Sequence, residues 1–129
     1  MLHSNITGKV IQQAFRVQNT LGCGFLEKVY ENSLAFALKQ AGLDVRQQVP
    51  LRVHFDGIMV GEYVADMVVE RAVLLELKAT ADNPPIYITQ VLNYLKATGL
   101  PVGLLLNFGK PKLYYRRFTL EETAADEAQ

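Results

Sequence analysis

The most constraining feature of this chain is a pair of apolar segments, 62–70 and 72–78, whose interiors carry charged residues. In the first, Asp66 is the only charge within a seven-residue apolar run, and the second, AVLLELK, contains Glu76 and Lys78. Both segments are rich in residues that favour strands, and they predict an antiparallel pair joined by a tight turn. The three charges therefore fall inside what is expected to be the most buried part of the sheet.

The expected pairing brings these charges together. A period of two places Glu76 and Lys78 on one face of their strand, and the turn sets Asp66 near Glu76. Two adjacent carboxylates with oxygen ligands only predict a site for Mg²⁺ or Mn²⁺, where Lys78 would stabilise a phosphate or position an attacking water. The alternative is an Asp66–Lys78 ion pair that fixes the hairpin. Function is favoured, because buried ion pairs seldom add stability.

The rest of the chain predicts three helices and three further strands. The first helix is expected to end in the break 21–24, and its candidate N-caps are Ser4, Asn5 and Thr7. The second is expected to run from about Phe25 to Gln40, before Gly42, and the third from Pro84-Pro85 to about Ala97, before Gly99. The strands are expected at 45–55, where Pro50 indicates an edge and Asp56-Gly57 a following hairpin, at 102–108, buried on both faces, and at 112–120. The order ααβββαββ predicts an α/β or α+β fold on one mixed sheet.

The length of 129 residues suits one domain, expected over 1–120, with an acidic, flexible tail at 121–129. The chain has 13 basic and 13 acidic residues, and the tail holds four acids and no base. The body is therefore mildly positive, which permits a polyanionic partner without requiring one. No apolar run is long enough for a bilayer and no signal peptide is recognisable, so a cytoplasmic protein without a membrane partner is expected.

Glu27 lies on the second predicted helix, near its apolar stripe. On a wheel of 100° per residue, Leu34 and Leu38 fall about 20° to either side of it. The carboxylate is thus expected at the edge of the buried face, where it needs a partner. It either takes part in a site, pairs with an arginine or caps the turn at 22–24.

Gln90 and Tyr94 are four residues apart on one face of the third predicted helix. That helix begins soon after strand 72–78 and should lie over its end. Gln90 could then reach Lys78, a phosphate or a metal-bound water. For Gln90 alone, a plain surface amide is the favoured interpretation, with Tyr94 at the edge of the core.

Together these residues resemble the D…ExK core of the PD-(D/E)xK, restriction-endonuclease-like nucleases, in Asp66 and Glu76-Leu77-Lys78. The segment 24–30, GFLEKVY, matches the signature of the GxxExxY branch of that superfamily. QVLNYL at 90–95 and GLLLNF at 103–108 resemble that branch's other motifs, and the likeness runs from about Thr7 to Phe118. Ala65 stands where the superfamily's name has proline.

The resemblance implies a restriction-endonuclease-like core, a mixed sheet flanked by helices, and a bound divalent metal ion, but it supplies no substrate. Our first hypothesis is hydrolysis of nucleic acid, DNA in preference to RNA, with Mg²⁺ or Mn²⁺. The resemblance also implies a site in which Asp66, Glu76 and the Leu77 carbonyl hold the metal, Glu27 adds an outer carboxylate, Lys78 is the catalytic lysine, and Gln90 and Tyr94 complete the arrangement.

Other functions compete with this interpretation. The first is a catalytically silent nucleic-acid-binding or regulatory module of the same fold. Its final strand, with Tyr114-Tyr115-Arg116-Arg117, would contact nucleic acid or pair with a second copy in a homodimer. A phosphohydrolase for a small molecule would use the same metal chemistry. A zinc enzyme is disfavoured because His3 and His54 lack ligand spacing, and the lone Cys23 excludes an internal disulfide.

Overall fold

The structure is a computed structural model that describes residues 2–120, so the predicted tail at 121–129 lies outside the described residues. Its elements follow the predicted order ααβββαββ. They are α1 (Ser4–Leu21), α2 (Glu27–Gln40), β1 (Val45–Phe55), β2 (Ile58–Val69), β3 (Val73–Lys78), α3 (Pro85–Thr98), β4 (Val102–Asn107) and β5 (Tyr114–Thr119). The strands form one mixed sheet in the order β1-β2-β3-β4-β5.

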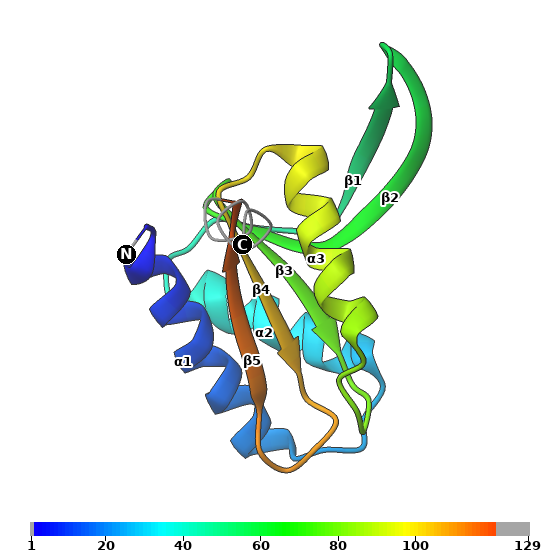
Figure 1. Ribbon diagram of the computed structural model, residues 1–129. Coiled ribbons are helices and arrows are strands. Elements are labelled where there is room, and N and C mark those ends of the chain that lie inside the picture. The colour runs from blue at the N-terminus through cyan, green and yellow to red at the C-terminus, as the bar shows by residue number, and fades with distance from the viewer. Residues whose placement is uncertain (1, 121–129) are drawn as a thin grey trace.

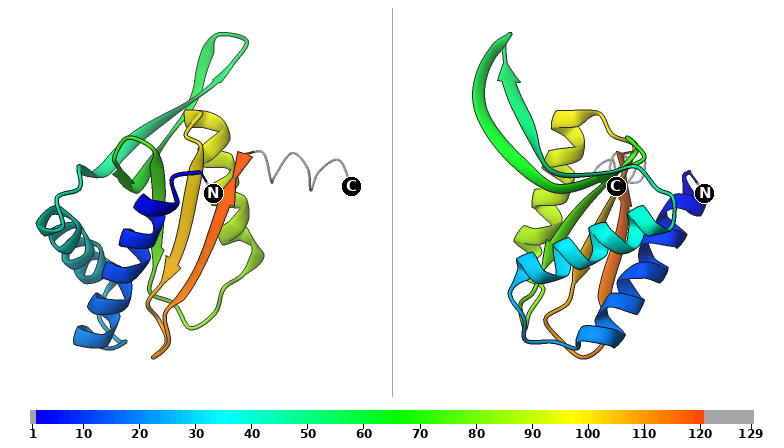
Figure 2. Two further views of the ribbon diagram at one scale, coloured as in Figure 1. Left: turned by 90° about the vertical axis from the view of Figure 1, so that its left-hand side faces the viewer. Right: turned by 180° about the vertical axis from the view of Figure 1, so that it is seen from behind.

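Helices cover both faces of the sheet, as Figures 1 and 2 show: α1 and α2 lie on one face and α3 on the other. One apolar core packs beneath α1 and α2, and a second packs beneath α3. β3 and β4 are parallel, with α3 as the crossover between them, while the other neighbours are antiparallel. The inner strand β4, between β3 and β5, is buried along its whole length, as predicted.

Local sequence signals account for most element ends. After α2, Gly42 has φ 86°, and the Gly42 and Leu43 N–H groups donate to the carbonyls of Lys39 and Leu38, the pattern of a Schellman motif. Gly99, at φ 72°, closes α3. The described part of the chain contains no helix long and apolar enough to cross a membrane.

The structure corrects several predicted boundaries. The N-cap of α1 is His3, without a side-chain hydrogen bond, and the candidate caps Ser4, Asn5 and Thr7 lie inside the helix, where the Thr7 hydroxyl donates to the Ser4 carbonyl. α2 begins at Glu27 rather than Phe25, because Leu26 is extended. The strand expected at 62–70 starts at Ile58, and the last strand is shorter than 112–120.

β1 and β2 form a long hairpin that curves beyond the rest of the molecule (Figure 1). They pair from Val45↔Val69 to Phe55↔Ile58 around the predicted turn, in which Asp56 has φ 50° and Gly57 φ 79°. β2 pairs with β3 only over residues 67–69. We call residues 49–65 of this hairpin, which extend past β3, the β-arm. Because β1 is an edge strand, Pro50 occupies the kind of position predicted for it.

Close packing of α3 on β4 at Gly103 leads to a first prediction. A Cβ there would lie 2.8 Å from Val91 Cγ1 and 3.3 Å from Leu95 Cδ1, so Gly103→Ala must displace α3. We expect a loss of about 1–3 kcal/mol in the free energy of unfolding, measured by urea denaturation. The control is Gly8→Ala on α1, where nothing lies within 4 Å of a new Cβ. A Gly103→Ala protein as stable as wild type would contradict this packing.

Candidate active site

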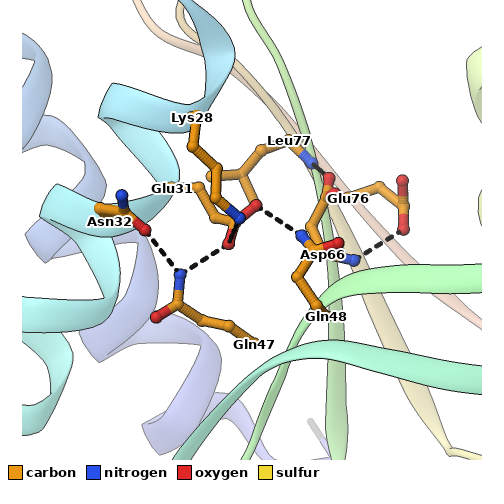
Figure 3. A network of polar contacts seen from close by, with 8 residues as sticks. All are labelled: Lys28, Glu31, Asn32, Gln47, Gln48, Asp66, Glu76 and Leu77. Carbon is orange, nitrogen blue, oxygen red and sulfur yellow. Dashed lines mark hydrogen bonds and ion pairs between the residues drawn. The ribbon is translucent and has the colours of Figure 1, made fainter.

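The site forms where β2 parts from β3. Pairing runs through Met67↔Leu75 and stops. One step further, side chains replace the ladder: the Asp66 N–H donates to Glu76 Oε1 over 3.3 Å, and the Leu77 N–H donates to Asp66 Oδ2 over 2.8 Å (Figure 3). The predicted neighbourhood of Asp66 and Glu76 is therefore present in the structure, and backbone hydrogen bonding fixes it.

A kink in the sheet accompanies this parting. In β1, Gln48 has φ 53° and lies between the paired positions Gln47↔Met67 and Val49↔Ala65, opposite Asp66. On β2, Met67 packs in the core beneath α1 and α2, whereas Ala65 packs beneath α3. Two residues that would share a face in a flat strand thus lie on opposite faces. The chain turns over at Asp66, which leaves its carboxylate beside β3.

The carboxylates of the site are held in an unfavourable electrostatic environment. Glu76 is only 4% exposed, and burial, followed by the charge of Asp66, raises its pKa to about 8. Burial also raises the pKa of Asp66, against the lowering effect of the Leu77 N–H bond. Each carboxylate keeps one oxygen that accepts no hydrogen bond from residues 2–120. These oxygens are available to a cation.

Lys78 connects the carboxylates with α3. Its Nζ donates to Gln90 Oε1 over 2.9 Å and lies 4.6 Å from the centre of the Tyr87 ring. Gln90 Nε2 in turn donates to the Tyr94 hydroxyl over 3.3 Å. Burial, then the charge of Glu76, raises the pKa of Tyr94. Gln90 is thus in contact with Lys78 rather than an isolated surface amide, which corrects the interpretation favoured from the sequence.

Ion pairing does not account for these charges. Within 2–120, the ion pairs of 4.0 Å or less join Lys28 to Glu31 and the arginines Arg46 and Arg71 to Asp44. None involves Asp66 or Lys78 among the described residues. The alternative in which an Asp66–Lys78 pair merely fixes the hairpin is therefore wrong.

Glu27 is placed differently from the prediction. It is the first residue of α2 and lies exposed instead of at the edge of the core, and it makes no hydrogen bond or ion pair with any residue from 2 to 120. Neither of the alternatives considered for Glu27, a pair with an arginine or a cap on the turn at 22–24, is therefore present among the described residues. Partial burial of the carboxylate, followed by the charge of Asp66, nevertheless raises the pKa of Glu27. It remains within the electrostatic field of the site without joining its hydrogen bonds.

Glu31 is the acidic residue that the sequence reasoning missed. It is 2% exposed, and its oxygens accept from Lys28 Nζ at 3.0 Å, Gln47 Nε2 at 2.6 Å and Gln48 Nε2 at 2.8 Å (Figure 3). Its charge also raises the pKa of Asp66. On the wheel used for Glu27, Glu31 lies about 40° away, inside the same apolar stripe. A charged residue inside an apolar stripe was the signal in the sequence that pointed to Glu31. In the structure, its hydrogen bond with Gln48 connects α2 with the kink.

The ligands available to a metal ion are limited. Among the residues that the structure describes, no three side chains of His, Cys, Asp or Glu come together closely enough to hold one. Asp66 and Glu76 therefore provide two hard oxygen donors. A Mg²⁺ ion bound there would complete its shell with backbone, water or substrate oxygens, as Mg²⁺ commonly does.

A groove opens next to Lys78, between α3 and the β-arm. It encloses about 780 Å³. Its lining comprises four basic residues, no acidic residue, three tyrosines and several amide, hydroxyl or apolar side chains: Arg52, Val53, His54, Tyr63, Lys78, Ile86, Tyr87, Thr89, Gln90, Asn93, Tyr94, Lys96 and Ala97. An anionic ligand suits such a lining. Sequence reasoning did not find this groove, since its walls come from β1, β2 and α3.

The raised pKa of Glu76 predicts an unusual dependence of stability on pH. Between its ordinary value of 4.5 and about 8, the folded state keeps a proton that the unfolded chain has lost. The free energy of unfolding should therefore fall as pH rises through this range, by on the order of a few kcal/mol, and level off above it. Urea denaturation in EDTA measures this. Glu76→Gln should flatten most of the decline, while Glu62→Gln, at an exposed position on β2, should retain it. A stability that rises with pH over this range would contradict the prediction.

Comparison with known proteins gives a family and a similar fold. The family model of the PD-(D/E)XK nuclease superfamily matches residues 4–118. The fold is similar to that of SSO0001, with a TM-score of 0.55 and 16% identity over 97% of this chain and 64% of that one, so this chain spans less than two thirds of it. It is also similar to the alkaline exonuclease LHK-Exo from Laribacter hongkongensis, with a TM-score of 0.53 and 13% identity over 98% of this chain and 75% of that one. No curated protein sequence matches significantly. With the family model covering most of its length, the chain belongs to the PD-(D/E)XK nuclease superfamily.

Proposed function

We propose that this protein is a nuclease that hydrolyses phosphodiester bonds of nucleic acid, DNA in preference to RNA, with Mg²⁺ or Mn²⁺. The observation that carries the proposal is the convergence of Asp66, Glu76 and Lys78 where β2 parts from β3, in a chain of a nuclease superfamily. LHK-Exo, whose fold is similar, is an alkaline exonuclease. That similarity supports the reaction class and leaves the substrate of this chain as part of the proposal.

The residues present fit a divalent cation. Asp66 and Glu76 offer one unused oxygen each, and the burial that raises the pKa of Glu76 is the condition that a bound cation would offset. With the Leu77 carbonyl, they form the proposed ligand set, and Glu27 acts as an outer carboxylate. When bound, Mg²⁺ or Mn²⁺ supplies Lewis-acid polarisation of the scissile phosphate and a more acidic water.

The remaining roles belong to the side chains next to α3. Lys78 is the proposed catalytic lysine, and its ammonium offsets the negative charge that grows on the phosphate during attack. Gln90 holds Lys78 through its 2.9 Å hydrogen bond, and Tyr94 fixes the orientation of Gln90. Gln90 and the Tyr87 ring, which both contact the Lys78 ammonium, thus limit the rotamers of a long and otherwise flexible side chain and preorganise its charge.

A catalytically silent nucleic-acid-binding module of the same fold is the second candidate. It is favoured by the lack of a third ligating side chain beside Asp66 and Glu76 within 2–120. Under this alternative the protein binds DNA in a salt-dependent way and hydrolyses none in any divalent metal. Membership of the GxxExxY branch, a homodimer and a cytoplasmic location stay predictions.

The metal site can be tested without a substrate. Mn²⁺ titrated into the protein should broaden amide NMR signals around residues 27, 66 and 76–78, because paramagnetic broadening is confined to the neighbourhood of the ion. Asp66→Asn should remove this localised effect, whereas the matched variant Glu62→Gln on the same strand should keep it. Broadening that persists unchanged in Asp66→Asn would place the ion elsewhere and overturn the proposed ligand set.

Catalysis is tested by Lys78→Ala with Mg²⁺ and short labelled DNA. Cleavage should fall by at least about 100-fold, since Lys78 stabilises charge that develops in the reaction. The Mn²⁺ broadening and the far-UV spectrum should be retained. Lys39→Ala, an exposed change on α2, is the control and should cleave at the wild-type rate. If Lys78→Ala also cleaves at that rate, the assignment of the catalytic lysine is wrong.

A further inference from the structure

The groove beside the carboxylates runs along one face of α3. Its α3 lining follows a helical spacing, with Ile86, Gln90, Asn93 and Ala97 on the same side. From 86 to 97 the helix rises about 16 Å, which corresponds to a run of a few nucleotides. Lys78 lines this groove and also interacts through its charge with Asp66 and Glu76, so it connects the groove with the carboxylates.

The chemistry of the lining combines anion binding with exposed flat surfaces. Arg52, His54, Lys78 and Lys96 are basic, and no acidic residue is present in the lining. Tyr63 is 52% exposed and Ile86 64% exposed. Thr89, Gln90 and Asn93 add groups that both donate and accept hydrogen bonds. The phosphates of a nucleic acid would account for the basic residues alone, and the exposed Tyr63 ring offers a surface for a further group of the ligand.

The exposed ring of Tyr63 favours a single strand over a duplex. A duplex presents phosphates to its surroundings and hides the faces of its bases in the stack, so a basic surface suffices to bind it. An unpaired strand can place its bases on aromatic rings, which contributes substantially to binding without a sequence requirement. A groove of about 780 Å³ is also the size of a site for a small ligand rather than for a turn of duplex.

Tyr63 is connected to the catalytic side of the site. Its ring lies 5.8 Å from that of Tyr94 with the planes tilted by 45°. The Tyr94 hydroxyl accepts from Gln90, which accepts from Lys78. A base on Tyr63 would therefore lie at a fixed position relative to Lys78. Arg52, on the same β-arm, also lines the groove.

We propose that the groove between α3 and the β-arm binds a single, unpaired nucleic-acid strand, with Tyr63 as the stacking residue and Arg52 as a phosphate contact. This inference rests on the proposed function and names the form of its substrate: single-stranded regions or unpaired ends. The ligand class is a polynucleotide strand with accessible bases, independent of sequence.

The test is fluorescence anisotropy of the full chain in EDTA, with a labelled 12-nucleotide DNA strand and the same sequence as a duplex. The single strand should bind at least about tenfold more tightly. Tyr63→Ala should weaken that binding by about tenfold or more, and Tyr63→Phe should restore it, because stacking needs the ring and not the hydroxyl. Tyr115→Ala is the matched control, a tyrosine of similar exposure (46%) on β5, and should bind like wild type.

Arg52 is tested through salt dependence. Arg52→Ala should weaken binding and reduce the slope of log K against log salt by about 0.7, the value for one phosphate contact to a single strand. Arg46→Ala, another exposed arginine of β1 that pairs with Asp44, should leave the slope unchanged.

Several results would overturn the inference. They are a duplex that binds as tightly as the single strand, a Tyr63→Ala protein that binds like wild type, or a loss of binding in Tyr115→Ala, which would place the strand on β5. Metal-dependent cleavage of a duplex, unaffected by Tyr63→Ala, would leave the proposed nuclease intact and remove this inference. Tight single-strand binding that needs Tyr63, without localised Mn²⁺ or hydrolysis, would support the groove and overturn the nuclease.

Discussion

The site depends on the loss of two ladder hydrogen bonds where β2 turns away from β3. Backbone N–H groups at such a point must find other partners, because leaving them unpaired is costly. Here the Asp66 N–H uses the Glu76 carboxylate and the Leu77 N–H uses the Asp66 carboxylate. These two hydrogen bonds hold the Asp66 and Glu76 side chains in place, and each carboxylate keeps one oxygen that accepts no hydrogen bond from residues 2–120. A structural role and a ligand role are therefore compatible in the same side chains.

Maintaining this arrangement places strain and unfavourable charge in one region. Gln48 adopts a left-handed φ of 53° opposite Asp66, and Glu31, buried beneath the β-arm's base, accepts from the Gln48 side chain. Burial, followed by repulsion from neighbouring carboxylates, raises the pKa values of Glu27, Asp66 and Glu76; the neighbour is Asp66 for the two glutamates and Glu31 for Asp66. Features of this kind disfavour folding and persist where function requires them. Their coincidence at one kink is more informative than any of the individual charges.

Local rules explain which parts of the molecule were predictable. The ends at Gly42 and Gly99, the Asp56-Gly57 turn and the proximity of Asp66 to Glu76 all follow from residues close in sequence. The burial of Glu31 instead of Glu27 did not, since it depends on Gln47 and Gln48 of β1 packing against α2. A helical wheel predicts which face of α2 is turned toward the core. Which residues along that face are buried depends on where the neighbouring strand β1 packs against the helix. The groove was likewise hidden, because its lining joins elements that only the tertiary fold brings together.

Lys78 lies between two regions of opposite charge. This arrangement predicts that binding of the cation and binding of the nucleic-acid strand depend on each other. On one side lie the carboxylates Asp66 and Glu76, and on the other lies a groove with basic residues and no acids. A nucleic-acid strand in that groove would be attracted by the basic residues and, once Asp66 and Glu76 have lost their protons, repelled at its reactive end unless a cation occupies the carboxylates. Cation and strand should then each favour the binding of the other, as linkage requires when one ligand relieves a repulsion felt by the second. The same acids whose ionisation lowers the stability of the metal-free fold would thus restrict productive binding of the strand to the metal-loaded protein.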